Sequence, residues 1–319
     1  MPNPYIRSMT THFVIMAGGQ GTRLYPLSTA EKPKQFLDLL GVGRTLIQLT
    51  CERFRAVDPH ALIWIVTSSS YVHWIKEQLP DIPAEQIIAE PEPRNTAPCI
   101  SYAVWKIKAK YGPCNIVVSP SDAYVLSIDS FKVTIKKALD FTARKTPSIV
   151  CVGIKPTEPN TGYGYIEISS IDKAKIADKQ EVIVKVSRFK EKPDIDTAKS
   201  YLKSGNFFWN AGIFIWNSET IEKEIRCNAP GIAQIMDSVA PSFYTENERL
   251  QMEKNFSKCE KISIDYAVME KSSHVWCLPA SWIWDDLGSF AAIEKVTGRK
   301  ISDEIKMAQE EYQKNKRGH

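Results

Sequence analysis

The chain has 319 residues, which suffices for one large α/β domain or for one domain with a small appendage. Its hydrophobic content of 43% and charged content of 24% are ordinary for a globular protein. The net charge of +4 is too small to require a nucleic-acid partner. The sequence has no run of about 18 apolar residues, so we expect no membrane span.

The seven cysteines form no Cys-x-x-Cys pair, and several lie within apolar runs, as Cys151 does. This usage is typical of small buried thiols in a reducing compartment. The five histidines show no metal-ligand spacing. No signal-peptide core precedes the first apolar run, so we expect a cytoplasmic protein.

Short apolar runs alternate with helix-like stretches through the first half of the chain. This alternation predicts an α/β fold with a mainly parallel (mixed) sheet and helices on both faces. Ligands then bind at the carboxyl ends of the strands. The expected strands are residues 13–17, 61–66, 115–118 and 148–153, and the expected helices are residues 71–79, 98–110 and 131–142.

The second half is predicted to be richer in strands. A polar excursion, residues 172–180, separates the first two of these strands, and a polar region extends from the helix of residues 219–227 to residue 261. No repeat or Pro/Gly/Ser linker divides the chain, so we expect one domain over residues 1–290 and a short, charged, helical tail over residues 291–319. The expected strands are residues 163–169, 182–189, 207–216 and 274–278, and the expected helix is residues 219–227.

A glycine-led stretch follows the first strand. Gly18, Gly19 and Gly21 leave backbone N–H groups free to meet an anion, and Arg23 and Lys34 add positive charge. The stretch is not a P-loop, because it has no Gly-Lys-[Ser/Thr]. It is not the dinucleotide fingerprint either, because leucine stands where the third glycine belongs. The pattern predicts a polyphosphate site.

The sequence Gly-Gly-x-Gly-Thr-Arg-Leu-x-Pro-Leu, followed by Lys-Pro-Lys-Gln, resembles the signature of the sugar-nucleotide pyrophosphorylases. Within that family the chain is most similar to the mannose-1-phosphate guanylyltransferases. The resemblance implies a Rossmann-like, GT-A-like nucleotidyltransferase fold, with residues 1–290 as the catalytic domain. The further matching stretches, in family order, are residues 90–98, 118–123, 160–167, 188–193, 208–216, 263–270 and 284–290.

The resemblance implies a GTP site built from the glycine stretch and from the loop of residues 90–98. Guanine presents two adjacent donors, which a carboxylate such as Glu90 or a loop carbonyl can accept, and Asn95 can meet the base as well. Taken alone, the loop is an ordinary helix entry with Asn95 or Thr96 as cap. The implied nucleotide-binding residues are Ala17, Gly18, Gly19, Gly21, Thr22, Arg23, Glu90, Asn95, Thr96 and Ser121.

A sugar 1-phosphate site is implied by three of the matching stretches. Glu191 would hold sugar hydroxyls, and Lys192 would hold the sugar phosphate. On charge alone, that stretch is a solvated basic run, and the aromatic stretch around Asn210 is mostly core. The implied sugar-phosphate-binding residues are Gly164, Glu167, Glu191, Lys192 and Asn210.

The resemblance also implies Mg²⁺, held by Asp122 and Asp286. Asp285 is adjacent to the second of these, but successive strand side chains point to opposite faces, so only one can face the metal. Ala123 departs from the histidine that the family usually has after the first aspartate. We expect Asp265 to cap a helix rather than to orient a ligand.

The implied activity is transfer of GMP from GTP to mannose 1-phosphate, which gives GDP-mannose and pyrophosphate. The implied catalytic residues are Arg23, Lys34, Asp122, Lys192 and Asp286. A related enzyme for another base or sugar, such as glucose 1-phosphate, and a non-catalytic regulatory paralogue remain as alternatives. We expect no β-helix and no cupin isomerase domain. The sequence leaves open whether the chain forms a homodimer and which glycan pathway uses the product.

Overall fold

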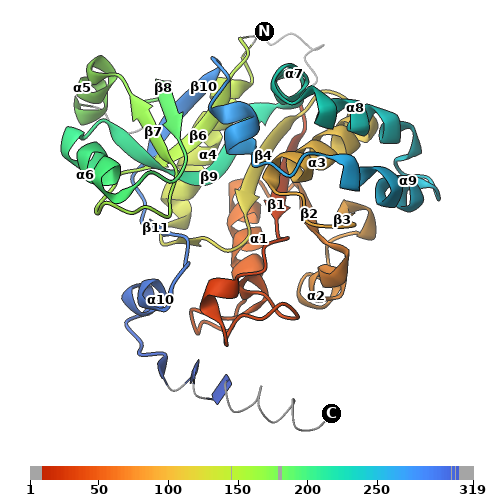
Figure 1. Ribbon diagram of the computed structural model, residues 1–319, viewed down its shortest axis with the longest axis horizontal. Coiled ribbons are helices and arrows are strands. Elements are labelled where there is room, and N and C mark those ends of the chain that lie inside the picture. The colour runs from red at the N-terminus through yellow and green to blue at the C-terminus, as the bar shows by residue number, and fades with distance from the viewer. Residues whose placement is uncertain (1–8, 145, 179–181, 303, 306, 309–319) are drawn as a thin grey trace.

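The computed structural model describes residues 9–144, 146–178, 182–302, 304–305 and 307–308 (Figure 1). A nine-stranded sheet runs through its centre, with the strands in the order β3-β2-β1-β4-β9-β6-β10-β8-β7. The strands are β1 (Thr11–Met16), β2 (Leu62–Ser68), β3 (Ile87–Glu90), β4 (Asn115–Pro120), β6 (Ile149–Ile154), β7 (Tyr165–Ile168), β8 (Val184–Lys190), β9 (Phe207–Asn217) and β10 (Val275–Ala280).

Most strands of this sheet point in one direction. β1 lies between β2 and β4 and is parallel to both, and β2 is parallel to β3. β6 and β10 are also parallel to each other. β9 runs against β4, β6 and β7, and β8 runs against β7 and β10. The expected mixed, mainly parallel sheet is therefore confirmed.

Helices cover both faces of the sheet, as strand periodicity requires. Neighbouring residues of β1 face opposite ways: Val14 packs in one apolar cluster, whereas Phe13 and Ile15 pack in the other. On the Val14 face lie α3 (Thr96–Tyr111), α7 (Ser218–Asn228), α8 (Pro230–Val239) and α9 (Glu248–Asn255). On the other face lie α1 (Leu46–Val57), α2 (Val72–Gln78), α4 (Ile128–Thr142) and α6 (Ile195–Ser204).

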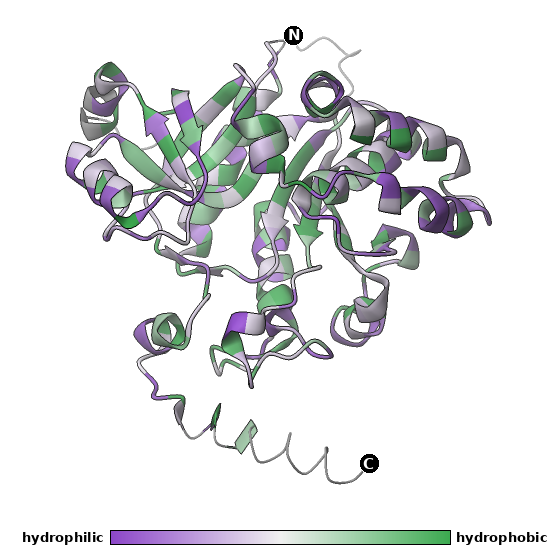
Figure 2. Ribbon diagram, viewed as in Figure 1, coloured by the Kyte–Doolittle hydropathy of each residue, from purple (hydrophilic) through white to green (hydrophobic). Residues whose placement is uncertain are grey.

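Apolar residues concentrate in the central strands, while the outer helix α9 is mainly hydrophilic (Figure 2). Buried parallel strands carry apolar side chains on both faces, and this explains why their runs were visible in the sequence. None of the helices in the described ranges combines the length and the apolar content that a membrane span would need.

One sequence expectation about local structure was wrong, and two polar stretches hold helices that were not predicted. Helix α5 (Ser170–Asp178) overlaps the polar excursion 172–180, and α8 and α9 lie in the polar region before residue 261. α8 begins at Pro230 and buries one apolar stripe of Ile232, Met236 and Val239, whose helical spacing was a signal available in the sequence. Glu90 was assigned to a loop, but it is the last residue of strand β3.

A second, two-stranded sheet joins distant parts of the chain. β5 (Tyr124–Val125), which directly follows the β4 turn, pairs antiparallel with β11 (Trp284–Asp285). This pairing brings the residues after β4 next to those after β11, at the carboxyl edge of β1 and β4.

Helix α10 (Phe290–Thr297) lies below this region in Figure 1. Its Ile293 and the following Ile301 pack with Leu24, Leu39, Leu46 and Leu287 in a small third cluster. The division of the chain at residue 290 stays a prediction. Residues 309–319, which belong to the predicted helical tail, lie outside the described residues.

Candidate active site

The glycine loop after β1 is held in place by Gln35. The buried amide nitrogen of Gln35 donates to the carbonyl oxygens of Ala17, at 3.0 Å, and Gly19, at 2.8 Å. In a trans peptide the C=O and the following N–H point in opposite directions. The N–H groups of Gly18 and Gln20 therefore face away from Gln35, as an anion-binding loop requires.

Steric constraints explain why two positions of the loop are glycine. Gly21 has a φ of +60°, and a Cβ there would lie 2.6 Å from the hydroxyl oxygen of Ser28. A Cβ at Gly18 would lie 3.2 Å from Oε2 of Glu90, so the loop closely approaches the end of β3. Thr22 and Arg23 follow in a short 3-10 helix, η1 (Thr22–Leu24).

Lys34 joins the first half of the site to the last strand. It begins the 3-10 helix η2 (Lys34–Phe36), and its side chain is only 9% exposed. Its ammonium nitrogen lies 3.1 Å from Oδ2 of Asp122 and donates to the backbone oxygen of Asp286 at 2.7 Å. The loop before Asp122 is fixed too, because the N–H of Ser121 donates to the oxygen of Met16.

Asp286 presents its two carboxylate oxygens differently. Oδ1 accepts hydrogen bonds from the hydroxyl of Tyr163 and from the N–H of Gly288, each at 3.0 Å. Oδ2 lies 3.8 Å from the guanidinium of Arg23, whose side chain is 70% exposed. The neighbouring carboxylate of Asp285 instead accepts a hydrogen bond from the N–H of Leu287 at 2.7 Å, so it stabilises the turn.

Asp122, Asp286, Arg23, Lys34 and the glycine loop line one cavity of about 310 Å³. Two carboxylates, cations and a glycine loop converge there, but the described residues hold no cluster of three or more metal-ligating side chains. Mg²⁺ typically takes one or two carboxylates and completes its shell with water and phosphate oxygens, so this donor set fits Mg²⁺. The lining residues are Gly19, Gly21, Thr22, Arg23, Lys34, Pro120, Asp122, Ala123, Trp284 and Asp286.

Glu90 lies buried beneath the glycine loop. Its Oε1 has no hydrogen-bond partner in the structure, and burial raises its pKa to about 8. An unpartnered buried carboxyl of this kind is rare and marks a place where a ligand can supply donors.

Asn95 and Thr96 have structural partners instead. Asn95 has a φ of 68° and accepts the N–H of Thr96 as the N-cap of α3. The hydroxyl of Thr96 accepts the N–H of Ile264 at 2.8 Å. The structure thus brings Glu90 to the glycine loop, and it places these two side chains at the start of α3.

A second group of side chains converges around Asn210. Asn210 donates to Oδ1 of Asp265 at 3.1 Å, and its backbone N–H donates to the oxygen of Gly164 at 2.8 Å. A Cβ at Gly164 would lie 2.4 Å from Oε2 of Glu191. Desolvation and the neighbouring Glu191 raise the pKa of Asp265 to about 7.

Lys192 completes this group. Its ammonium lies 3.1 Å from Oε1 of Glu191, and its side chain is largely exposed. Its φ of 43° is rare for a residue with a side chain. Glu167, also predicted here, pairs across the strands with Arg188 at 2.9 Å and accepts from Asn206. These contacts engage both of its carboxylate oxygens.

Sequence reasoning missed three residues of the site. Gln35 and Tyr163 lie inside the quoted motifs, but neither was given a role. Asp265 was expected to cap a helix; it lies in the π-helix η7 (Asp265–Met269) and accepts from Asn210. The sequence did offer one signal for Asp265: it lies in the matching stretch of residues 263–270, and no other residue of that stretch had been given a role.

Comparison with known proteins accounts for this arrangement. The sequence model of the nucleotidyl transferase family matches residues 12–302. The chain belongs to the nucleotidyl transferase family. The match includes every residue of the cavity described above.

Relatives of this nucleotidyl transferase include the xanthan biosynthesis protein XanB of Xanthomonas campestris pv. campestris (strain B100), which is 34% identical over 89% of this chain and 59% of its own length. The mannose-1-phosphate guanylyltransferase of Escherichia coli is 32% identical over 91% of this chain and 62% of its own length. The chain thus spans less than two thirds of the curated relatives it matches.

A crystal structure from Thermus thermophilus, described as a mannose-1-phosphate geranyltransferase, superposes with a TM-score of 0.78 at 28% identity. The superposition covers 91% of this chain and 80% of the other. This likeness confirms the expected nucleotidyltransferase fold.

Proposed function

We propose that this nucleotidyl transferase moves GMP from GTP to mannose 1-phosphate. One observation carries the proposal: Asp122, Asp286 and the glycine loop line a single cavity, with Lys34 bridging the two aspartates. The names of the relatives from E. coli and T. thermophilus support mannose 1-phosphate as the acceptor, and the former supports guanine as the base.

The reaction needs no general base. An ionised phosphate oxygen of mannose 1-phosphate attacks the α-phosphorus of GTP in line with the leaving group. The bond from this phosphorus to the bridging oxygen of the β-phosphate breaks, and pyrophosphate departs with its electron pair. The barrier is charge repulsion and positioning, which a preorganised site can reduce.

The chain's own residues divide this work. The N–H groups that Gln35 turns outward, together with Arg23, would hold the β- and γ-phosphates. Lys34 is less exposed than Arg23 and would place its charge near the α-phosphate of GTP. Lys192 would hold the phosphate of mannose 1-phosphate. Asp122 and Asp286 would hold Mg²⁺, which when bound supplies positive charge to the phosphate oxygens.

Base and sugar recognition would come from two separate groups. Glu90 offers its unpartnered carboxyl to the N1–H and N2 amine of guanine. Glu191, Asn210 and Asp265 offer carboxylate and amide oxygens to mannose hydroxyls. A site built to hydrogen-bond a ligand group rejects an analogue that lacks this group, because buried polar atoms of the site are then left without a partner.

We further propose a cytoplasmic location, supported by seven cysteines that are all free in the structure. Whether the protein forms a homodimer is a separate question, which its size in solution answers.

Pyrophosphate release tests the proposed function. The protein is assayed with MgCl₂ and each nucleoside triphosphate, crossed with mannose and glucose 1-phosphates. GTP with mannose 1-phosphate should exceed every other pair by about tenfold or more. Faster release from GTP with glucose 1-phosphate would overturn the sugar assignment, and faster release from another nucleoside triphosphate with mannose 1-phosphate would overturn the base assignment. No release from any pair would favour the non-catalytic paralogue.

A further inference from the structure

We propose that Tyr163 is a positioning residue that orients Asp286 and couples metal binding to sugar-phosphate binding. The inference rests on the proposed function for the identity of the two ligands.

The hydroxyl of Tyr163 donates to Oδ1 of Asp286 at 3.0 Å. The same oxygen also accepts the N–H of Gly288 at 3.0 Å. A carboxylate oxygen has about two lone-pair positions, so Oδ1 is saturated by these two donors. Only Oδ2 remains to face a cation in the cavity. Partners of this kind behind a metal-binding carboxylate fix its orientation and strengthen its affinity.

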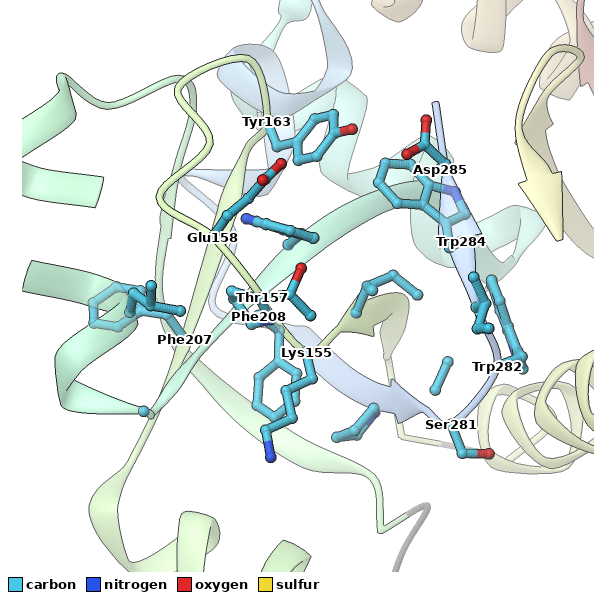
Figure 3. A pocket seen from close by; sticks show the side chains of 18 of the residues that line it. Lys155, Thr157, Glu158, Tyr163, Phe207, Phe208, Ser281, Trp282, Trp284 and Asp285 are labelled. Atoms are coloured by element: carbon cyan, nitrogen blue, oxygen red, sulfur yellow. The ribbon is translucent and has the colours of Figure 1, made fainter. Parts of the chain in front are cut away.

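The ring of Tyr163 cannot turn away easily. It makes edge-to-face contacts with Trp209, at 5.0 Å between ring centroids, and with Trp284, at 5.1 Å. Figure 3 shows Tyr163 at the edge of a larger cavity, with its hydroxyl directed toward Trp284 and Asp285. Trp284 also lines the cavity that holds the aspartates. Tyr163 therefore stands in the aromatic wall between the two cavities.

The same tyrosine belongs to the proposed sugar-binding turn. It stands between Gly162 and Gly164, and the oxygen of Gly164 accepts the N–H of Asn210 at 2.8 Å. Gly164 also closely approaches Glu191. A sugar phosphate that orders this turn would order the Tyr163 hydroxyl, and thereby Asp286. Because such coupling is reciprocal, each ligand should tighten the binding of the other.

Calorimetric titration of the protein with MnCl₂, in the absence of GTP, tests the inference separately from turnover. Native protein should bind Mn²⁺ more tightly when mannose 1-phosphate is present. Tyr163→Phe should weaken Mn²⁺ binding by about tenfold and should remove most of the effect of the sugar phosphate. Tyr165→Phe is the matched control, because the hydroxyl of Tyr165 donates to the oxygen of Asn160 instead, and it should bind Mn²⁺ as the native protein does.

Unchanged Mn²⁺ binding by Tyr163→Phe, or no Mn²⁺ binding by the native protein, would overturn the inference. Equal melting temperatures of the two variants would show that folding is not the cause of any difference. The proposed function can fail separately. If Mn²⁺ affinity depends on Tyr163 but the native protein releases no pyrophosphate, the positioning role stands and the proposed activity is wrong.

Discussion

The ammonium group of Lys34 lies 3.1 Å from a carboxylate oxygen of Asp122, with almost no exposure of the lysine to solvent. The two residues come from different connections between strands, after β1 and after β4. The same ammonium donates to the backbone of Asp286. Lys34 thus joins the carboxylate of Asp122 to the backbone of Asp286, the two residues on which the proposed chemistry depends, and it keeps a positive charge between them.

Replacing this cation should be costly for turnover. Lys34→Met removes a preorganised charge from the cavity, and we expect kcat to fall by about 100-fold or more. Lys32→Met is the control, because the ammonium of Lys32 lies over the ring of Trp74, at 4.6 Å, instead. Steady-state pyrophosphate release measures both variants. A Lys34→Met variant with a rate near that of Lys32→Met would remove Lys34 from the mechanism.

Gln35 should affect GTP binding more than the chemical step. Gln35→Leu leaves the carbonyl of Gly19 without its side-chain donor and leaves the carbonyl of Ala17 with the hydroxyl of Thr67 alone, so the loop N–H groups are held less firmly. We expect the KM for GTP to rise about tenfold, with a smaller change in kcat. Initial rates at varied GTP test this, and circular dichroism checks the fold. An unchanged KM for GTP would show that the loop holds its shape without Gln35.

The sequence could predict the parts of the fold that repeat a simple pattern. Buried parallel strands such as β1 and β4 are continuous apolar runs, so their presence and order were visible. The two carboxylates Asp122 and Asp286 were found by resemblance. Their approach depends on the short β5–β11 pairing and on Lys34, and neither leaves a periodic signal in the sequence.

Side-chain partners were harder to predict than motifs. Thr96 has a cap-like position but accepts from the distant Ile264, and Asp265 accepts from Asn210. Both contacts join residues far apart in the chain, so no local rule predicts them. Tyr163 lies in a glycine turn that the sequence assigned to sugar binding, yet its hydroxyl contacts Asp286.

Substitution of Gly164 should affect the binding of the sugar phosphate but not that of GTP. A Cβ there would lie 2.4 Å from Oε2 of Glu191, which is the mobile end of a side chain. Gly164→Ala should therefore fold but displace Glu191, raising the KM for mannose 1-phosphate about tenfold with little change for GTP. Gly231→Ala, in α8, has nothing within 4 Å of the added Cβ and should behave as the native enzyme does. An equal rise of both KM values in Gly164→Ala would contradict this assignment.

Glu90 should make GTP binding depend on pH. Burial raises its pKa from 4.5 to about 8, so at pH 7 the free protein carries a proton there. Guanine donors favour the carboxylate, which lowers this pKa in the complex, so binding should release a proton and tighten as pH rises toward about 8. Calorimetry at about pH 7 in buffers of different ionisation enthalpy measures the protons released.

Glu90→Gln provides the matched comparison, because glutamine has the same shape and does not titrate. It should release fewer protons on binding GTP, by up to one per site, and its affinity should depend less on pH. Protons released by the triphosphate itself are common to both proteins and cancel in the difference. Identical proton release by both proteins would mean that Glu90 does not change its charge when GTP binds.

Transfer of the α-phosphate of GTP to mannose 1-phosphate is the defining step of the proposed reaction. GTP labelled with radioactive phosphorus, first at the α-position and then at the γ-position, tests it directly after separation of the products by anion exchange. GDP-mannose should carry the α-label, and pyrophosphate should carry the γ-label. The proposed reaction is contradicted if the α-label appears in GDP or GMP, or if the label stays in GTP while mannose 1-phosphate and Mg²⁺ are both present.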